Sequence, residues 1–210
     1  MNGVLPDPVA LETLVRAASF QVLLERGEPI QPARLAEVTG IRRETLAVVL
    51  DQLSQAGRIR RDDEGRVIGS GGLSVATDRH TIEIEGRPFW TWCAYDIFGI
   101  FGALEASGRS TSTSPADRRP IELRFVRGRP EPIEAVLFRP DTELMASCEN
   151  VYEQWCPNSN LFVTAGEAEA WASANHLKGT VLKLDEAADL ATAEWKEMTG
   201  ATVSLRRDAG

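Results

Sequence analysis

Residues 93–104 read CAYDIFGIFGAL, a stretch that is too apolar for a helix at the protein surface. A helix that is hydrophobic on all sides is buried, so this stretch predicts a core helix. Two polar groups interrupt it, Cys93 and Asp96. Because residues three apart in a helix share a face, we expect the thiol and the carboxyl group to lie side by side.

Aromatic residues surround this pair, among them Trp90, Trp92 and Tyr95. A buried carboxylate is costly unless it is partnered or protonated. Burial also raises the proton affinity of a carboxyl group, which would make Asp96 a proton carrier near neutral pH. The alternative is structural, with Asp96 capping a local turn or pairing with an arginine. The two tryptophans are core residues or, alternatively, walls of an apolar pocket.

The sequence before the buried stretch predicts a helical module over residues 1–70. The expected elements are helices at residues 8–26, 31–39 and 43–56 and short strands at residues 58–61 and 66–68. Helices followed by a hairpin are typical of a winged helix. Its arginines are almost balanced by acids, which argues against DNA binding and favours a module that packs on the following domain.

The glycine-rich residues 69–72 (GSGG) predict the boundary to a second domain, residues 71–210. Its expected elements are strands at residues 73–84, 121–126, 133–138 and 179–184, a loop at residues 107–120, and helices at residues 164–176 and 185–198. Thr164 with Glu167 fits a capping box, and Asp185 is a candidate N-cap. We therefore expect an α+β protein, with an N-terminal winged-helix-like helical module followed by a mixed β-sheet domain with flanking helices.

The charge balance and composition exclude several classes of protein. The chain carries 31 acidic and 23 basic residues, a formal net charge of −8. Phosphate-rich partners attract basic surfaces, so this balance argues against a nucleic-acid partner and against an anionic membrane surface. No apolar run approaches the roughly 18 residues of a membrane span. The N-terminus lacks the basic start and apolar core of a signal peptide, so we expect a cytoplasmic protein.

The three cysteines are Cys93, Cys148 and Cys156. An odd, small number in a cytoplasmic chain does not predict a disulfide framework. The alternatives are three buried apolar thiols, or a thiol site for catalysis or metal binding. The two histidines, His80 and His176, are too far apart in the sequence for metal-ligand spacing.

Residues 72–104 read GLSVATDRHTIEIEGRPFWTWCAYDIFGIFGAL and resemble the organomercurial (alkylmercury) lyases. In that family a strand rich in Ile and Val leads into an aromatic residue, and W-C-A-x-D then opens an apolar segment. The matching residues are Trp92, Cys93, Ala94 and Asp96. Residues 168–173 (AEAWAS) are also similar to a family motif, and the resemblance covers roughly residues 10–200.

The resemblance implies an enzyme that cleaves carbon–mercury bonds by protonolysis. Two thiolates take the metal, because mercury is soft and thiolate sulfur is the soft ligand that a protein offers. Cys93 would attack and bind the metal, and Cys156 would supply the second thiolate. Asp96, also close to the metal, would take the proton of Cys93 and deliver it to the departing carbon.

The resemblance also implies the compounds that this chemistry needs. The substrate is a small organometal compound, and no organic cofactor is required. Hg(II) is the bound product, and external thiols remove it. Small thiols or a mercuric reductase would be the product acceptor, in a pathway of mercury detoxification.

The second thiol departs from the family pattern. Well-known members have a Cys-Cys pair, and an ungapped match places Cys156 on the first cysteine and Pro157 on the second. The resemblance assigns catalysis to the second position, so a shift of one residue would be needed to bring Cys156 there. Cys148 is a spare thiol or a back-up ligand. The family's structural cysteine is absent from residues 107–120, which would affect stability more than chemistry.

Two other functions stay open. Pro157 and the shortened set of cysteines favour a paralogue that uses Cys93 and Asp96 on another thiol-reactive or organometal substrate, in specialised metabolism. The alternative from a different class is a non-catalytic soft-metal carrier or sensor, whose winged helix contacts DNA or a partner protein.

Overall fold

The computed structural model describes residues 8–207 of the chain. The helices are α1 (Pro8–Arg26), α2 (Pro32–Thr39), α3 (Arg43–Gln55), α4 (Ala94–Leu104), α5 (Thr142–Ser147), α6 (Val151–Gln154), the 3-10 turn η1 (Cys156–Asn158), α7 (Ala165–Ala174) and α8 (Leu184–Arg207). The strands are β1 (Ile59–Arg61), β2 (Val67–Ser70), β3 (Leu73–Ser74), β4 (His80–Ile84), β5 (Arg87–Thr91), β6 (Gly108–Thr113), β7 (Pro120–Val126), β8 (Arg129–Pro130), β9 (Val136–Pro140), β10 (Asn160–Phe162) and β11 (Gly179–Lys183).

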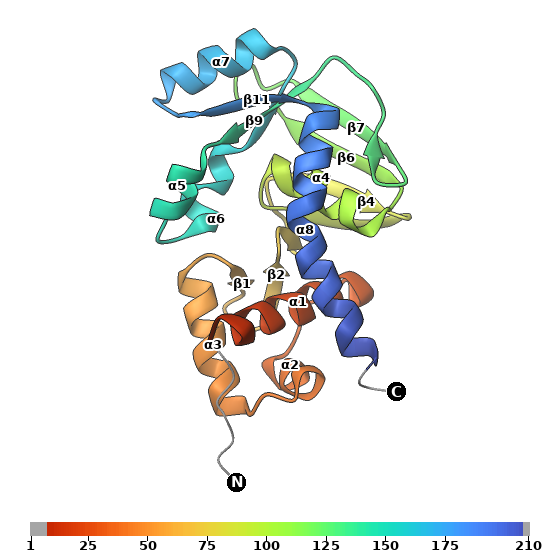
Figure 1. The fold of residues 1–210 in the computed structure, drawn as a ribbon, viewed down its shortest axis with the longest axis vertical. Helices are drawn as coiled ribbons and strands as arrows, with labels where there is room; N and C mark the ends of the chain where they lie inside the picture. Colours follow the sequence, from red (N-terminus) through yellow and green to blue (C-terminus); the bar gives the residue numbers. More distant parts are fainter. Residues whose placement is uncertain (1–7, 208–210) are drawn as a thin grey trace.

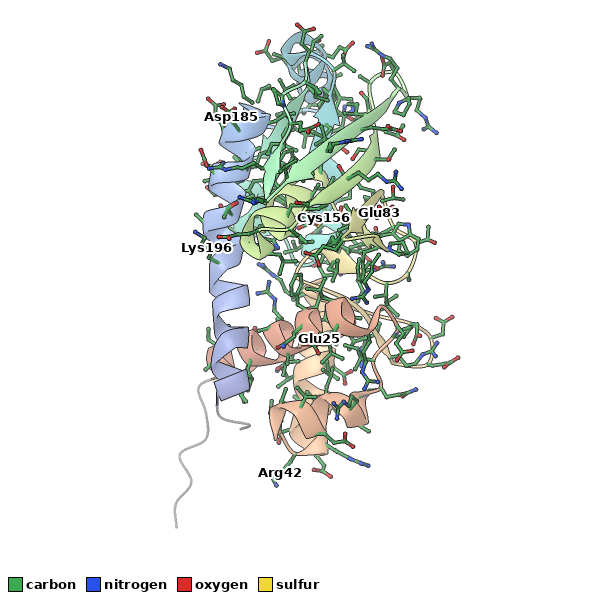
Figure 2. The ribbon with its side chains drawn as sticks, turned by 90° about the vertical axis from the view of Figure 1, so that its right-hand side faces the viewer. Glu25, Arg42, Glu83, Cys156, Asp185 and Lys196 are labelled. Atoms are coloured by element: carbon green, nitrogen blue, oxygen red, sulfur yellow. The ribbon has the colours of Figure 1, made fainter. Side chains whose placement is uncertain are left out.

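Two sheets organise these residues. The larger has the strand order β1-β2-β3-β5-β4-β6-β7-β8, and the smaller has the order β10-β9-β11. Helices α1–α3 lie at one end of the molecule, and the smaller sheet with α7 lies at the other (Figure 1). Helix α8 runs along one side between them, as its labelled residues Asp185 and Lys196 show in Figure 2. The strand pairings described here are all antiparallel, whereas the sequence predicts a mixed sheet.

Helices α1–α3 and the β1–β2 hairpin occupy the region that the sequence predicts to be a helical module. The apolar stripe of α3 is buried, as its spacing predicts, and consists of Leu46, Val49, Leu50 and Leu53. The hairpin continues through β3 into the larger sheet, so the two predicted regions share one sheet. The winged-helix assignment and the domain boundary stay predictions.

The glycine-rich segment at residues 69–72 is a tight hairpin. Gly69 and Ser70 end β2, and Gly71 and Gly72 turn the chain into β3. The two turn glycines have φ values of 58° and 84°, a conformation that residues with a side chain rarely adopt. All four residues are buried, so the segment is a packed turn within the sheet rather than an open linker.

Helix α4 is buried from Ala94 to Gly102, which confirms the prediction of a core helix. On one side Phe101 stacks on Phe125 of β7, with ring centroids 4.1 Å apart. On another side α8 comes so close that a Cβ added to Gly99 would lie 2.3 Å from the Trp195 ring. Neither α4 nor any other helix within residues 8–207 has the length and apolar character to cross a bilayer.

Several sequence predictions are wrong. Residues 107–120, expected as a loop, contain strand β6, which pairs with both β4 and β7. Its buried positions are Ser110 and Ser112. Buried and exposed residues therefore alternate as in other strands, but the buried ones are small and polar, so no pattern of apolar residues marks the strand. Helix α8 continues to Arg207 instead of ending near residue 198, and it packs along α4 and α1. Asp185 lies inside its first turn and is not the N-cap.

Two other expected strands have different first or last residues in the structure. The strand expected at residues 73–84 is divided into β3 and β4, and β9 begins at Val136. The capping box of α7 is present as predicted. Thr164 N–H donates to Glu167 Oε2 at 3.3 Å, and Glu167 N–H donates to Thr164 Oγ1 at 3.2 Å.

Replacing Phe101 with alanine is expected to lower the free energy of unfolding by about 3–5 kcal/mol, because loss of the buried ring leaves a cavity beside Phe125. Val126→Ala, on the same strand but 50% exposed, is the control and should cost less than about 1 kcal/mol. Urea unfolding measures both variants. Equal losses in the two would contradict the central position of α4.

Candidate active site

The N-terminus of α4 holds Cys93 and Asp96 together. Cys93 is the N-cap residue, with an extended backbone, and Asp96 is the third residue of the helix. The backbone N–H of Cys93 donates to Asp96 Oδ2 at 2.8 Å. This bond belongs to a capping box and satisfies an amide that would otherwise be buried without a partner. The alternative that Asp96 caps a local turn is therefore correct, and it leaves the same carboxyl group available for chemistry.

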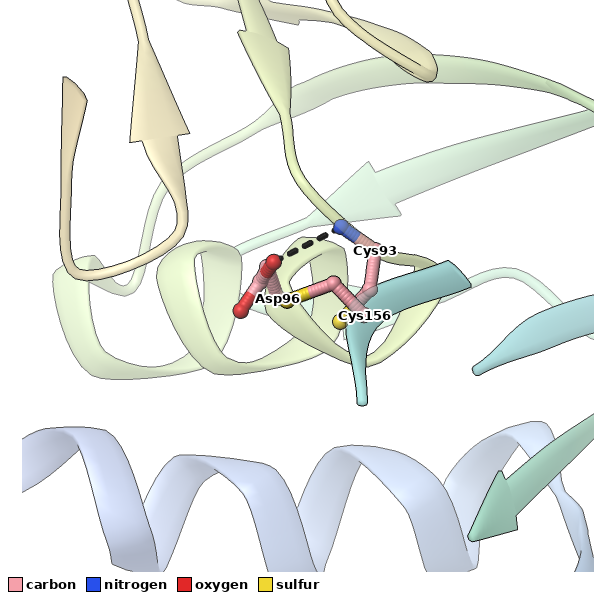
Figure 3. A group of neighbouring side chains, drawn as sticks. All are labelled: Cys93, Asp96 and Cys156. Atoms are coloured by element: carbon pink, nitrogen blue, oxygen red, sulfur yellow. Dashed lines mark hydrogen bonds between the residues drawn. The ribbon is translucent and has the colours of Figure 1, made fainter. Parts of the chain in front are cut away.

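Cys156 reaches this pair from a distant part of the chain. It begins the turn η1, which leads into β10, and it lies inside the molecule (Figure 2). The backbone N–H of Ala94 donates to the carbonyl of Ser159 at 3.1 Å, which ties this segment to the start of α4. The two sulfur atoms and a carboxylate oxygen of Asp96 lie within 4.8 Å of one another (Figure 3).

The position of Cys156 answers the question raised by Pro157. Cys156 itself faces Cys93 and Asp96, so a second sulfur is presented without a shift of one residue. Pro157 lies in the first part of the η1 turn, where the missing N–H of proline has no hydrogen bond to lose.

Gly72 forms the wall behind Asp96. A Cβ on Gly72 would lie 2.3 Å from both Cγ and Oδ1 of Asp96. Its carbonyl accepts from the N–H of Trp92 at 3.1 Å, and the carbonyl of Gly71 accepts from Trp195 Nε1 at 3.0 Å. The sequence interpretation as a linker misses this role, although adjacent glycines can mark a close approach of backbone.

Arg79 joins the two thiol-bearing segments, a role that sequence reasoning missed. Its guanidinium donates to the carbonyl of Trp92 at 3.0 Å and to the carbonyl of Tyr152 at 3.2 Å. The guanidinium also lies over the Tyr152 ring, 4.4 Å from its centroid. Trp92 precedes Cys93, and Tyr152 is one helical turn before Cys156. No sequence motif marks Arg79, because its partners are backbone atoms far along the chain.

Burial governs the protonation of the site. Cys93 is fully buried, and Asp96 and Cys156 are 5% and 3% exposed. Burial raises the pKa of Asp96 to about 7, against hydrogen bonds with Cys93 that lower it. Burial, a hydrogen bond with Cys156 and the charge of Asp96 raise the pKa of Cys93 well above its usual range. At neutral pH Asp96 can therefore gain and lose a proton, while Cys93 rests as a neutral thiol.

The remaining candidates lie outside this cluster. Cys148 follows the last residue of α5, and its thiol donates to the carbonyl of Leu144 at 3.0 Å. His80 is buried, with Nδ1 2.9 Å from the hydroxyl of Ser112. Burial lowers the pKa of His80 to about 4, so the ring is neutral and serves the packing of the sheet.

A cavity of about 80 Å³ opens beside the cluster. Cys156 and Asp96 line it, and Trp92, Tyr95 and Trp155 supply apolar surface. Cys93 has no exposed surface. The cavity therefore offers a small organic group an apolar space next to one sulfur and one carboxyl group whose pKa is about 7.

Asp96→Asn is expected to change how stability depends on pH. The pKa of Asp96 is about 7 in the folded state, compared with about 3.9 in an unfolded chain. The folded state thus holds the proton more tightly, and this contribution to stability is present below pH ~4 and lost as pH rises through 7. Asparagine cannot ionise but still offers an oxygen to Cys93 N–H. The unfolding free energy of the variant minus that of the wild type should grow by about 2–3 kcal/mol between pH ~5 and ~8.

Urea unfolding of both proteins at each pH measures this difference. Comparing the two proteins removes the contribution of titrating groups that the substitution leaves unchanged, and Cys93, whose pKa lies well above its usual range, stays a neutral thiol between pH ~5 and ~8. A difference that stays constant across the range would contradict the raised pKa of Asp96.

Comparison with known proteins identifies relatives of this chain. Residues 73–196 match the family model described as alkylmercury lyase. The alkylmercury lyase of Pseudomonas putida is 30% identical over 165 residues, which cover 75% of this chain and 74% of that protein. The alkylmercury lyase of Staphylococcus epidermidis is 28% identical over 190 residues, which cover 88% and 82%.

The fold also has a counterpart among solved structures. The crystal structure of the mercury-bound form of MerB2 aligns with a TM-score of 0.74 and 23% identity, covering 85% of this chain and 86% of that one. This likeness establishes a shared fold. The family match extends over more than half of the residues, and together with the relative at 30% identity it shows that this chain belongs to the alkylmercury lyases, a family of carbon–mercury lyase enzymes.

Proposed function

We propose that this protein cleaves the carbon–mercury bond of small organomercurials by protonolysis. The observation that carries the proposal is the cluster of two sulfur atoms and one carboxylate oxygen within 4.8 Å. Mercury(II) is a soft metal, and thiolate sulfur is its preferred protein ligand. The carbon that leaves the metal needs a proton, and Asp96 is the group beside the sulfur atoms that can supply it.

The cavity suggests the order in which the thiols act. In a cell rich in small thiols the substrate is an adduct, R–Hg–SR′. Cys156 lines the cavity and Cys93 has no exposed surface, so the sulfur of Cys156 meets mercury first and displaces R′S⁻. Cys93 then completes the pair. The family resemblance assigns the first attack to Cys93, whereas the position of the cavity favours Cys156.

Proton transfer accompanies both steps. Coordination to a metal deprotonates a thiol, so Cys156 and Cys93 each lose one proton as they bind mercury. The proton of Cys156 goes to the displaced R′S⁻. The proton of Cys93 goes to Asp96, which accepts it at neutral pH because burial raises the pKa of its carboxyl group to about 7.

Bond cleavage follows from the two thiolates. They push electron density onto mercury and weaken its bond to carbon, and the carbon then takes the proton from Asp96. The products are R–H, R′SH and Hg(II) held by Cys93 and Cys156. The two protons that leave the protein thiols are therefore both accounted for.

Product release requires other thiols. Small thiols can exchange with the two protein sulfurs and carry Hg(II) away, to remain in solution or to reach a mercuric reductase. No organic cofactor takes part in these steps. We place this chemistry in the cytoplasm, where thiols are kept reduced, with detoxification of organomercurials as its role.

We also propose a structural role for the N-terminal module, residues 1–70. Arg16, Gly57 and Arg58 form part of the cavity wall, and α1 packs against α8. These contacts favour a module that completes the site over one that binds DNA.

Cys93→Ser, Cys156→Ser and Asp96→Asn are each expected to reduce the release of benzene from phenylmercury at least about 100-fold, in the presence of excess small thiol. A serine hydroxyl is a hard ligand that binds mercury poorly, and asparagine cannot carry the proton. Cys148→Ser is the matched control and should retain the wild-type rate, because Cys148 lies outside the cluster. Gas chromatography measures the benzene.

The same assay separates the alternatives. Stoichiometric binding of mercury without benzene would favour a soft-metal carrier. Absence of mercury binding would favour an enzyme with a different substrate. Full activity of Cys156→Ser would overturn the two-thiolate mechanism.

A further inference from the structure

The cavity beside Cys156 has a basic side. Among its lining residues are three arginines, Arg16 of α1, Arg58 between α3 and β1, and Arg139 of β9. The acidic lining residues are Asp96 and Glu194. Asp96 already accepts a hydrogen bond from the backbone N–H of Cys93, so the arginines need another partner for their positive charges.

One of the three arginines, Arg139, has an ion-pair partner within the protein, although its Nε, like that of Arg16, is buried without a hydrogen-bond partner. Arg139 Nη2 forms an ion pair with Glu194 Oε1 at 2.9 Å. Its guanidinium also lies over the Tyr95 ring, 4.8 Å from the centroid. Glu194 is thereby committed to Arg139 and does not neutralise the other two.

Arg16 and Arg58 have no such partner. Within the described residues neither guanidinium forms a hydrogen bond or an ion pair, and Arg16 Nε is buried without an acceptor. Burial and the charge of Arg58 lower the pKa of Arg16, and the charge of Glu12 raises it. The two guanidinium charges beside one small cavity repel each other, and an anion between them would relieve that repulsion.

The backbone holds Arg58 next to the thiol-bearing segment. The N–H of Val151 donates to the carbonyl of Ala56 at 3.0 Å, and Asn150 Nδ2 donates to the carbonyl of Gln55 at 3.2 Å. These bonds connect the turn after α3 to helix α6, which leads into Cys156. The position of Arg58 therefore does not depend on its own side chain.

We propose that Arg16 and Arg58 form a carboxylate-binding subsite next to Cys156, which makes a carboxylate-bearing ligand the preferred occupant of the cavity. The guanidinium group presents paired N–H donors that match a carboxylate, and such charge-assisted bonds are stronger than neutral ones. The carboxylate belongs either to the organic group on mercury or to the small thiol that delivers it. This inference rests on the proposed lyase function, for which it defines a class of substrate.

Paired substrates of equal size distinguish the two sources. In the first arm, 4-carboxyphenylmercury is compared with 4-carbamoylphenylmercury, both delivered by the neutral thiol mercaptoacetamide. In the second arm, phenylmercury is delivered by mercaptoacetate or by mercaptoacetamide. In wild-type protein the acid is expected to have a KM about tenfold below that of its amide in one of the arms.

Variants of Arg58 test the assignment to this residue. Arg58→Gln should bring the ratio of the KM values of acid and amide close to one, because the side chain then carries no charge to pair with the carboxylate. Arg58→Lys keeps the charge and should retain part of the preference, which separates charge from a change in folding. Arg124→Gln, at a 75% exposed side chain on β7, is the matched control and should behave as wild type. Equal KM values for acid and amide in both arms, or a preference that survives in Arg58→Gln, would overturn the proposal.

A binding measurement separates failure of this proposal from failure of the lyase function. Trp92, Trp155 and Trp195 line the cavity, so its occupation should change tryptophan fluorescence. Benzoate is expected to give a saturable change that benzamide does not give and that Arg58→Gln removes. This result would support the subsite even if wild-type protein released no benzene from phenylmercury. Identical responses to benzoate and benzamide would overturn it.

Discussion

The buried N-terminus of α4 is the constraint on which the site depends. A helix leaves its first N–H groups without partners, and at this end the N–H of Cys93 bonds to the carboxyl group of Asp96 at 2.8 Å. One carboxyl group thus serves the fold as a cap and, in the proposed mechanism, the site as a proton carrier. The helix end favours negative charge, whereas burial favours the protonated forms. For Asp96 burial prevails, and the pKa rises to about 7.

Close packing around this helix end explains why small residues surround it. Gly72 and Gly99 leave no room for a Cβ, because Asp96 lies against the first and the Trp195 ring against the second. The larger sheet, the turn at residues 71–72 and α8 therefore enclose α4 at short range. Such enclosure removes water from the thiols and leaves the cavity beside Cys156 as the space next to them. The N-terminal module contributes to the wall of that cavity, so the site draws on both predicted regions.

Local patterns predicted much of the fold. The buried helix α4, the apolar stripe of α3 and the capping box of α7 depend on spacing within a few residues, and all three are present. Strand β6 was not predicted, because its buried positions are serines and its hydrogen-bond partners come from β4 and β7. Helix α8 is longer than the sequence predicts, and along its length it packs against α4 and α1.

The sequence by itself determined the pairing of Cys93 with Asp96 and the resemblance to the alkylmercury lyases. Both depend on residues that are close together in the chain, and Cys93 and Asp96 meet as the N-cap and the third residue of one helix. Only the tertiary structure decided that Cys156 completes the cluster, that Gly72 closes it and that Arg79 joins its two segments. It also decided that Asp96 titrates near neutral pH, because a pKa depends on burial and neighbouring charges, and these come from segments far apart in the sequence.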